Sequence, residues 1–86
     1  MSRYVYGGID YTKHLICPLT KSVFVDPVAA SDGHTYEKSA LEEFLKLPEE
    51  PVSPKTGELL DRTFMMPNLY IQSFLKKVKQ VEEGEI

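Results

Sequence analysis

The 86-residue chain carries a formal net charge of −3 and a single cysteine, which together exclude several classes of protein. A nucleic-acid module is disfavoured because it would present a basic face to phosphates. A disulfide framework is excluded, and Cys17, His14 and His34 fall short of the four ligands of a closed zinc site, so we expect neither metal nor cofactor.

The hydropathy of the chain argues against a membrane partner. No apolar run approaches the roughly 18 residues of a spanning helix, and no signal peptide opens the sequence. A lone cysteine also suits a reducing compartment. We therefore expect an intracellular protein, in the cytoplasm or the nucleus.

Residues 1–12 form a lead-in that is rich in tyrosine. The pair Gly7-Gly8 argues against continuous regular structure there. We predict a flexible N-terminal arm, and the alternative is an arm that packs on a neighbour through its tyrosines.

A first loop is predicted around Ile16-Cys17-Pro18-Leu19-Thr20. Proline fixes φ near about −65°, so this loop can hold Ile16 and Leu19 outward and rigid. After it, a hairpin is predicted over residues 28–36, with Asp32-Gly33 as a tight two-residue turn.

A central helix is predicted from Glu37 to about Leu47, with Thr35 as its N-cap. Its apolar residues share one stripe: Ala40, Leu41, Phe44 and Leu45. Pro48 and Pro51 end this helix and lead into a second rigid loop over residues 52–57.

A short strand is predicted over residues 64–66, and a last helix from Leu69 to about Val81, capped by Asn68. Its apolar residues recur with helical spacing: Ile71, Phe74, Leu75 and Val78. We expect this face to pack against the central helix, so that Leu75→Ala costs about 2–5 kcal/mol. The sequence shows no internal repeat.

Five short motifs follow one another along the chain: CPLT at 17–20, DPV at 26–28, DGHTYE at 32–37, SPKT at 53–56 and MPNL at 66–69. In this order and spacing they resemble the U-box family of ubiquitin ligases. The resemblance implies an α+β fold with a small antiparallel sheet, a central helix, two extended loops and a C-terminal helix. It divides the chain into an arm (1–12), a U-box domain (13–81) and a tail (82–86).

The U-box resembles a RING finger whose zinc ligands have been replaced. The positions that answer to those ligands are Cys17, Thr20, Asp32, His34, Glu37, Ala40, Ser53 and Thr56. Apart from Ala40, we infer a structural hydrogen-bond network in place of zinc, in which Asp32, Glu37, Ser53 and Thr56 tie loops together. Because one net hydrogen bond contributes about 0.5–1.5 kcal/mol, apolar burial must supply most of the stability.

The resemblance also implies a surface that docks a ubiquitin-charged conjugating enzyme and promotes transfer to a substrate lysine by positioning. The implied contact residues are Ile16, Pro18, Leu19, Phe44, Val52, Ser53 and Pro54. Leu19 is the strongest candidate, because an apolar side chain beside Pro18 has little core to enter. No catalytic nucleophile is expected on this chain, and the protein substrate would be recruited by another region or chain.

One departure from the family pattern bears on activity. Many members carry an arginine just after the Pro-x-[TN] of the second loop, where this chain has Gly57. Lys55 is the nearest candidate for a ubiquitin-activating contact, and Arg62 lies further on. A second interpretation therefore stays open: a non-catalytic interaction or dimerisation module, including a homodimer.

Overall fold

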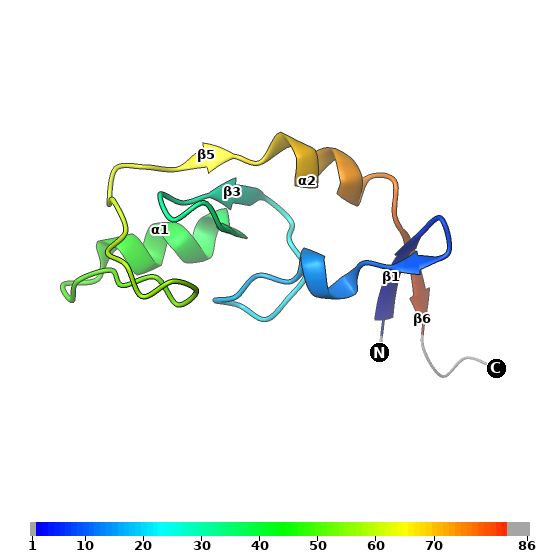
Figure 1. Cartoon of the computed structure of the whole chain (residues 1–86), viewed down its shortest axis with the longest axis horizontal. Helices are drawn as coiled ribbons and strands as arrows, with labels where there is room; N and C mark the ends of the chain where they lie inside the picture. The colour runs from blue at the N-terminus through cyan, green and yellow to red at the C-terminus, as the bar shows by residue number, and fades with distance from the viewer. Residues whose placement is uncertain (1, 83–86) are drawn as a thin grey trace.

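The computed structural model describes residues 2–82 and has the expected α+β architecture, with short helices and two small antiparallel sheets (Figure 1). In chain order the elements are β1 (Ser2–Tyr6), β2 (Ile9–Asp10), the 3-10 helix η1 (Thr12–Leu15), β3 (Pro27–Ala29), β4 (Thr35–Glu37), α1 (Lys38–Lys46), β5 (Met66–Pro67), α2 (Leu69–Leu75) and β6 (Lys79–Glu82). Among these elements no helix has both the length and the apolar character needed to span a membrane.

The central sheet has the strand order β4-β3-β5, with Val28 paired to Tyr36 on one side and to Pro67 on the other. Proline is tolerated at position 67 because β5 is an edge strand. Helix α1 contacts β4 and α2 contacts β3. In the view of Figure 1, α2 lies above β3 and α1 below it. The sheet therefore separates the two helices.

The core lies between α1 and this sheet. Its buried members are Cys17, Phe24, Val28, Ala30, Tyr36, Leu41, Leu45 and Leu60. Helix α2 has no buried residue, and Ile71 and Leu75 reach the core only as partly buried neighbours. The last helix therefore packs mainly on β3, and of its predicted contacts with the central helix only Ile71 and Leu75 reach the cluster that contains Leu41 and Leu45.

The hairpin turn has three residues, and the expected two-residue turn is wrong. Ala29 pairs with Thr35, and the N–H of Ala30 donates to the carbonyl of His34. Residues 31–33 therefore form the loop, and Gly33 adopts a φ of 83°. This is the arrangement in which a type I turn is followed by a left-handed glycine.

The central helix begins and ends within one residue of its predicted bounds, but its predicted N-cap is wrong. Thr35 belongs to β4, and its hydroxyl accepts a hydrogen bond from Asn68 Nδ2. Glu37 occupies the N-cap position and makes no side-chain cap. Asn68 does cap α2 as predicted, since its Oδ1 accepts from the N–H of Ile71 at 3.1 Å.

The two ends of the described chain form a second sheet, β2-β1-β6, in which Ser2 pairs with Glu82. Residues 2–10 are thus paired strands, with Gly7 and Gly8 in the turn, where regular structure had not been expected. The last helix also stops at Leu75 rather than near Val81, because residues 79–82 form β6. Of the predicted tail, residues 83–86 lie outside the described residues.

Aromatic packing joins this terminal sheet to α2. The ring of Phe74 meets Tyr6 edge-on at 5.6 Å and Tyr11 at 4.9 Å between centroids. Such contacts add to the free energy gained from burial alone. Phe74 therefore packs against β1 and the residue that follows β2, and not against the central helix.

Candidate functional site

Two loops of the same construction define the candidate site. Loop 1 (residues 16–23) is closed by pairing of Ile16 with Val23, and loop 2 (residues 52–59) by pairing of Val52 with Leu59. Figure 1 shows both on the side of the sheet away from α2.

The backbone hydrogen bonds of the two loops correspond one by one. In loop 1 the N–H of Cys17 donates to Ser22 and that of Lys21 donates to Cys17. In loop 2 the N–H of Ser53 donates to Glu58 and that of Gly57 donates to Ser53. The matching left-handed residues are Lys21, with a φ of 62°, and Gly57, with a φ of 79°.

The side chains at the second position of each loop also match. Cys17 Sγ accepts from the N–H of Leu19 at 3.3 Å, and Ser53 Oγ accepts from the N–H of Lys55 at 3.0 Å. The two loops are thus a repeat in structure, which the sequence, with no internal repeat, did not predict. The sequence signals of this repeat are Pro-x-Thr at 18–20 and 54–56 and an apolar residue at each end of both loops, which together are too short to be distinctive.

A buried polar network joins loop 2 to the hairpin. Asp32 Oδ2 accepts hydrogen bonds of 2.6 Å from the hydroxyls of both Ser53 and Tyr36. Asp32 Oδ1 accepts from the backbone N–H of His34 at 2.8 Å. Ser53 also accepts from the N–H of Thr56, so one hydroxyl both orders loop 2 and anchors it to the hairpin.

The part of Tyr36 in this network was not predicted from the sequence. Tyr36 is fully buried, but in the sequence it looks like an ordinary strand residue.

The network shifts the acidities of its members. Burial opposes ionisation of Asp32, but the hydrogen bonds from Ser53, Tyr36 and the His34 N–H outweigh it and lower the pKa of the carboxyl below 3.8. Burial, together with the hydrogen bond to Asp32, raises the pKa of Tyr36 to about 12. Asp32 is therefore a carboxylate and Tyr36 a neutral phenol at neutral pH.

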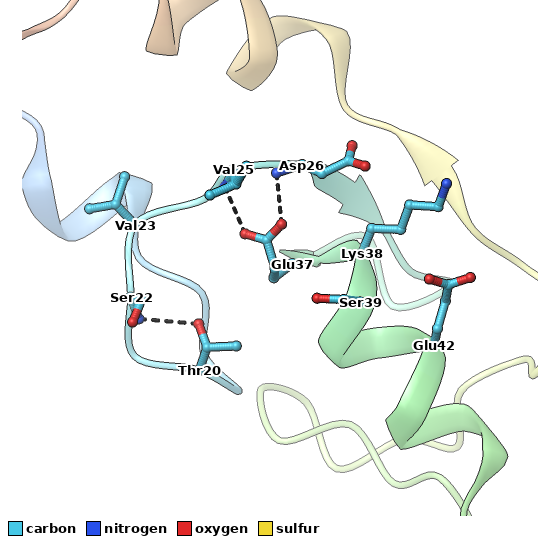
Figure 2. A pocket seen from close by; sticks show the side chains of 9 residues that line it. All are labelled: Thr20, Ser22, Val23, Val25, Asp26, Glu37, Lys38, Ser39 and Glu42. Carbon is cyan, nitrogen blue, oxygen red and sulfur yellow. Dashed lines mark hydrogen bonds between the residues drawn. The ribbon is translucent and has the colours of Figure 1, made fainter.

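Glu37 and Cys17 hold loop 1 and the two residues Val25 and Asp26 that follow it against the start of α1. Both carboxylate oxygens of Glu37 accept at 2.7 Å, one from the N–H of Val25 and the other from that of Asp26 (Figure 2). The N–H of Glu37 donates to Cys17 Sγ at 3.2 Å, and Cys17 is fully buried. A surface depression of about 610 Å³ lies between these elements, and none of the implied contact residues lines it.

The other residues implied at zinc-ligand positions contribute less to the hydrogen bonds that join the loops to the rest of the fold. Thr20 and Thr56 bond only within their own loops, to the N–H groups of Ser22 and Glu58. His34 enters the network through its backbone N–H. Ala40 is partly buried on α1. Within residues 2–82 no three His, Cys, Asp or Glu side chains are placed to hold a metal ion.

The implied contact residues differ in exposure. Ile16, Pro18 and Phe44 are half-buried, while Val52 and Pro54 are exposed. Leu19 is also half-buried and packs against the core. The expectation that it has little core to enter is therefore wrong. Ser53 is only 3 % exposed. Its hydroxyl belongs to the buried network, and its side chain is not a surface contact.

Arg62 binds the carbonyl end of α1. Its guanidinium donates to the carbonyls of Leu45 at 2.6 Å, Leu47 at 2.9 Å and Glu49 at 2.9 Å. These are carbonyls at and just beyond the end of the helix, where cations are favoured. This role was not visible in the sequence, because Arg62 and Leu45 are joined only by the fold.

Comparisons with known proteins agree with this geometry. The family model of the U-box domain matches residues 12–80. The chain is 46 % identical over 55 residues to U-box domain-containing protein 35 of Arabidopsis thaliana, covering 64 % of this chain and 6 % of that protein. It is 34 % identical over 71 residues to U-box domain-containing protein 36 of the same organism, covering 83 % and 16 %.

A human protein is similar as well. The chain is 42 % identical over 53 residues to the WD repeat, SAM and U-box domain-containing protein 1 of Homo sapiens, covering 62 % of this chain and 11 % of that protein. The chain thus spans at most 16 % of the length of these three relatives.

Proposed function

This chain belongs to the U-box domain family, whose members are generally ubiquitin ligases that bind conjugating enzymes, and on that premise we propose that it promotes ubiquitin transfer by docking a charged conjugating enzyme. The bond that breaks is the thioester on the conjugating enzyme's cysteine, and the new amide forms on a substrate lysine. The chain's part is to position these two groups. Its own cysteine, Cys17, is buried with two backbone N–H groups on its sulfur and supplies no nucleophile.

One observation carries the proposal: the family match covers two loops of the same construction that keep apolar side chains partly exposed. The proposed contacts are Ile16, Pro18 and Leu19 of loop 1, Phe44 of α1, and Val52 and Pro54 of loop 2. Each loop is held by a hydrogen bond of a buried side chain: Cys17 Sγ accepts from the N–H of Glu37 in loop 1, and Ser53 Oγ donates to Asp32 in loop 2. Rigid loops support tight positioning because little conformational entropy is lost on docking.

The proposed complex is small and short-lived, since the conjugating enzyme must leave to be recharged. The protein substrate is proposed to bind another region or another chain. We place this activity inside the cell, where Cys17 stays reduced.

A second candidate function is a non-catalytic interaction module. Its support is that the Arg62 guanidinium donates to three carbonyls of α1 and the following turn, so Arg62 is held at the end of α1. Gly57 supplies no charge, so the exposed Lys55 is the cation of loop 2 that we propose for the contact with ubiquitin. Lysine lacks the bidentate fork of arginine, so this interpretation predicts binding with little acceleration of transfer.

Single-turnover discharge of a ubiquitin-charged conjugating enzyme to free lysine separates these two functions. We expect the parent chain to accelerate discharge with some members of a panel of enzymes, and Leu19→Ala to remove the acceleration. Because Leu19 also packs against the core, Pro54→Ala serves as a second variant on an exposed position.

The matched control is Val25→Ala, which removes an apolar side chain that is 86 % exposed and lies outside the proposed contacts. This variant should discharge as fast as the parent. Binding without acceleration by the parent would favour the non-catalytic module. Equal loss in Val25→Ala and Pro54→Ala would contradict docking through the two loops.

A further inference from the structure

A recess of about 300 Å³ beside loop 1 gathers basic side chains from separate parts of the fold. Lys13 and His14 come from η1, His34 from the end of the hairpin turn, and Lys55 from loop 2. None of the described residues that line the recess is acidic. This concentration of basic groups contrasts with the net charge of −3 of the whole chain.

The recess is continuous with the proposed docking surface, because Ile16 and Pro18 of loop 1 also line it. A protein that contacts these two residues from the side of η1 would also lie next to the basic groups. Two residues that line the recess, Thr35 and Asn68, are joined by a hydrogen bond of 2.7 Å.

Hydrogen bonds fix the backbone of two of the basic residues. The N–H of Lys55 is held by the buried Ser53 hydroxyl, and the N–H of His34 by Asp32. The Asp32 carboxylate keeps its charge and interacts electrostatically with His34, so the positive charge of the recess rests mainly on Lys13 and Lys55. Lys13 and Lys55 are both exposed.

We infer that this recess is an electrostatic extension of the docking surface that selects conjugating enzymes carrying acidic side chains next to the part that contacts Ile16 and Pro18. The inference rests on the proposed function and names the chemistry of its partner. Like-charged enzymes would be disfavoured at the same place, so the recess sets specificity among conjugating enzymes.

The test measures binding of uncharged conjugating enzymes from a panel, at low and at high salt. We expect the double variant Lys13→Glu/Lys55→Glu to bind the preferred enzyme about tenfold more weakly than the parent at low salt. We also expect it to lose most of the parent's salt dependence, because exposed charges are screened by salt. Lys13→Arg/Lys55→Arg keeps the charge and should bind like the parent.

The matched control is Lys38→Glu/Lys76→Glu, which makes the same change in net charge at two exposed lysines outside the recess. It should bind within about twofold of the parent. An equal loss in this control would show a general effect of net charge and overturn the inference. Parent-like binding by Lys13→Glu/Lys55→Glu would overturn it as well.

Two further outcomes are distinguishable. A charge effect that appears only with the ubiquitin-charged enzyme would make ubiquitin the occupant and overturn the assignment to the conjugating enzyme. If Leu19→Ala abolishes binding while Lys13→Glu/Lys55→Glu does not change it, the proposed function stands and the recess has no part in it. If the parent binds no enzyme of the panel, the proposed function and the inference about the recess are both wrong.

Discussion

The Ser53 hydroxyl donates a hydrogen bond of 2.6 Å to the Asp32 carboxylate, and this bond fastens loop 2 to the hairpin turn. Both residues occupy positions that the family resemblance relates to zinc ligands. Within the described residues every buried side-chain nitrogen or oxygen has a hydrogen-bond partner. A satisfied polar network of this kind fixes geometry, because each unpaired member would be costly to bury.

Removal of the Ser53 hydroxyl should destabilise the domain. Ser53→Ala leaves the N–H groups of Lys55 and Thr56 without their partner and removes one of the two hydroxyl donors to Asp32 Oδ2. We expect a loss of about 1–3 kcal/mol in the free energy of unfolding, measured by urea denaturation. Thr56→Ala removes a hydroxyl that accepts one exposed bond and should cost less than about 1 kcal/mol. Equal costs would argue against the network as the anchor of loop 2.

Tyr36 sets an alkaline limit to stability. Its pKa is raised from 10.0 to about 12 in the folded chain, so between these pH values the unfolded chain loses a proton that the folded chain keeps. The stability from neutral Tyr36 is therefore complete below pH 10 and is lost as pH rises towards 12. We expect Tyr36→Phe to flatten the fall of unfolding free energy across this window.

The control for this pH dependence is Tyr70→Phe, at a tyrosine that is 91 % exposed. It should leave the slope of unfolding free energy against pH unchanged. If Tyr36→Phe falls as steeply as the parent above pH 10, another group causes the alkaline loss.

Arg62 should contribute to stability through its fork of donors. Arg62→Lys keeps the charge but cannot reach the carbonyls of Leu45, Leu47 and Glu49 together. We expect a loss of about 1 kcal/mol, with faster hydrogen exchange in the last turn of α1. Arg3→Lys, on an exposed strand position, is the control. Slower ubiquitin discharge with unchanged hydrogen exchange would instead indicate a direct contact with the partner.

The depth of burial should separate two leucines. Leu41 is fully buried, and Leu41→Ala should cost about 2–5 kcal/mol. Leu75 is only partly buried, so Leu75→Ala should cost about 1–2 kcal/mol, less than the helix pattern alone had indicated. Denaturant curves of the two variants measure the difference. A larger loss for Leu75 would place the main core beside α2.

Local sequence determined the elements whose signals are local. The helical stripe of Leu41 and Leu45 predicted α1, Asn68 predicted the start of α2, and Asp32-Gly33 predicted a turn. In each case the residues that decide the structure lie within one or two turns of chain. The family resemblance rests on the same short motifs, and it also gave the correct fold class.

The tertiary structure decided everything that depends on distant partners. The last helix ends at Leu75 because residues 79–82 pair with β1. The helical spacing of apolar residues up to Val78 gives no sign of this strand pairing. Thr35 bonds to Asn68 rather than capping α1, and Arg62 caps α1 from outside it. Hydrogen bonds and strand pairs between distant residues form only when folding brings them together. Sequence periodicity alone therefore indicates which residues are polar or apolar, but not which partner each will meet.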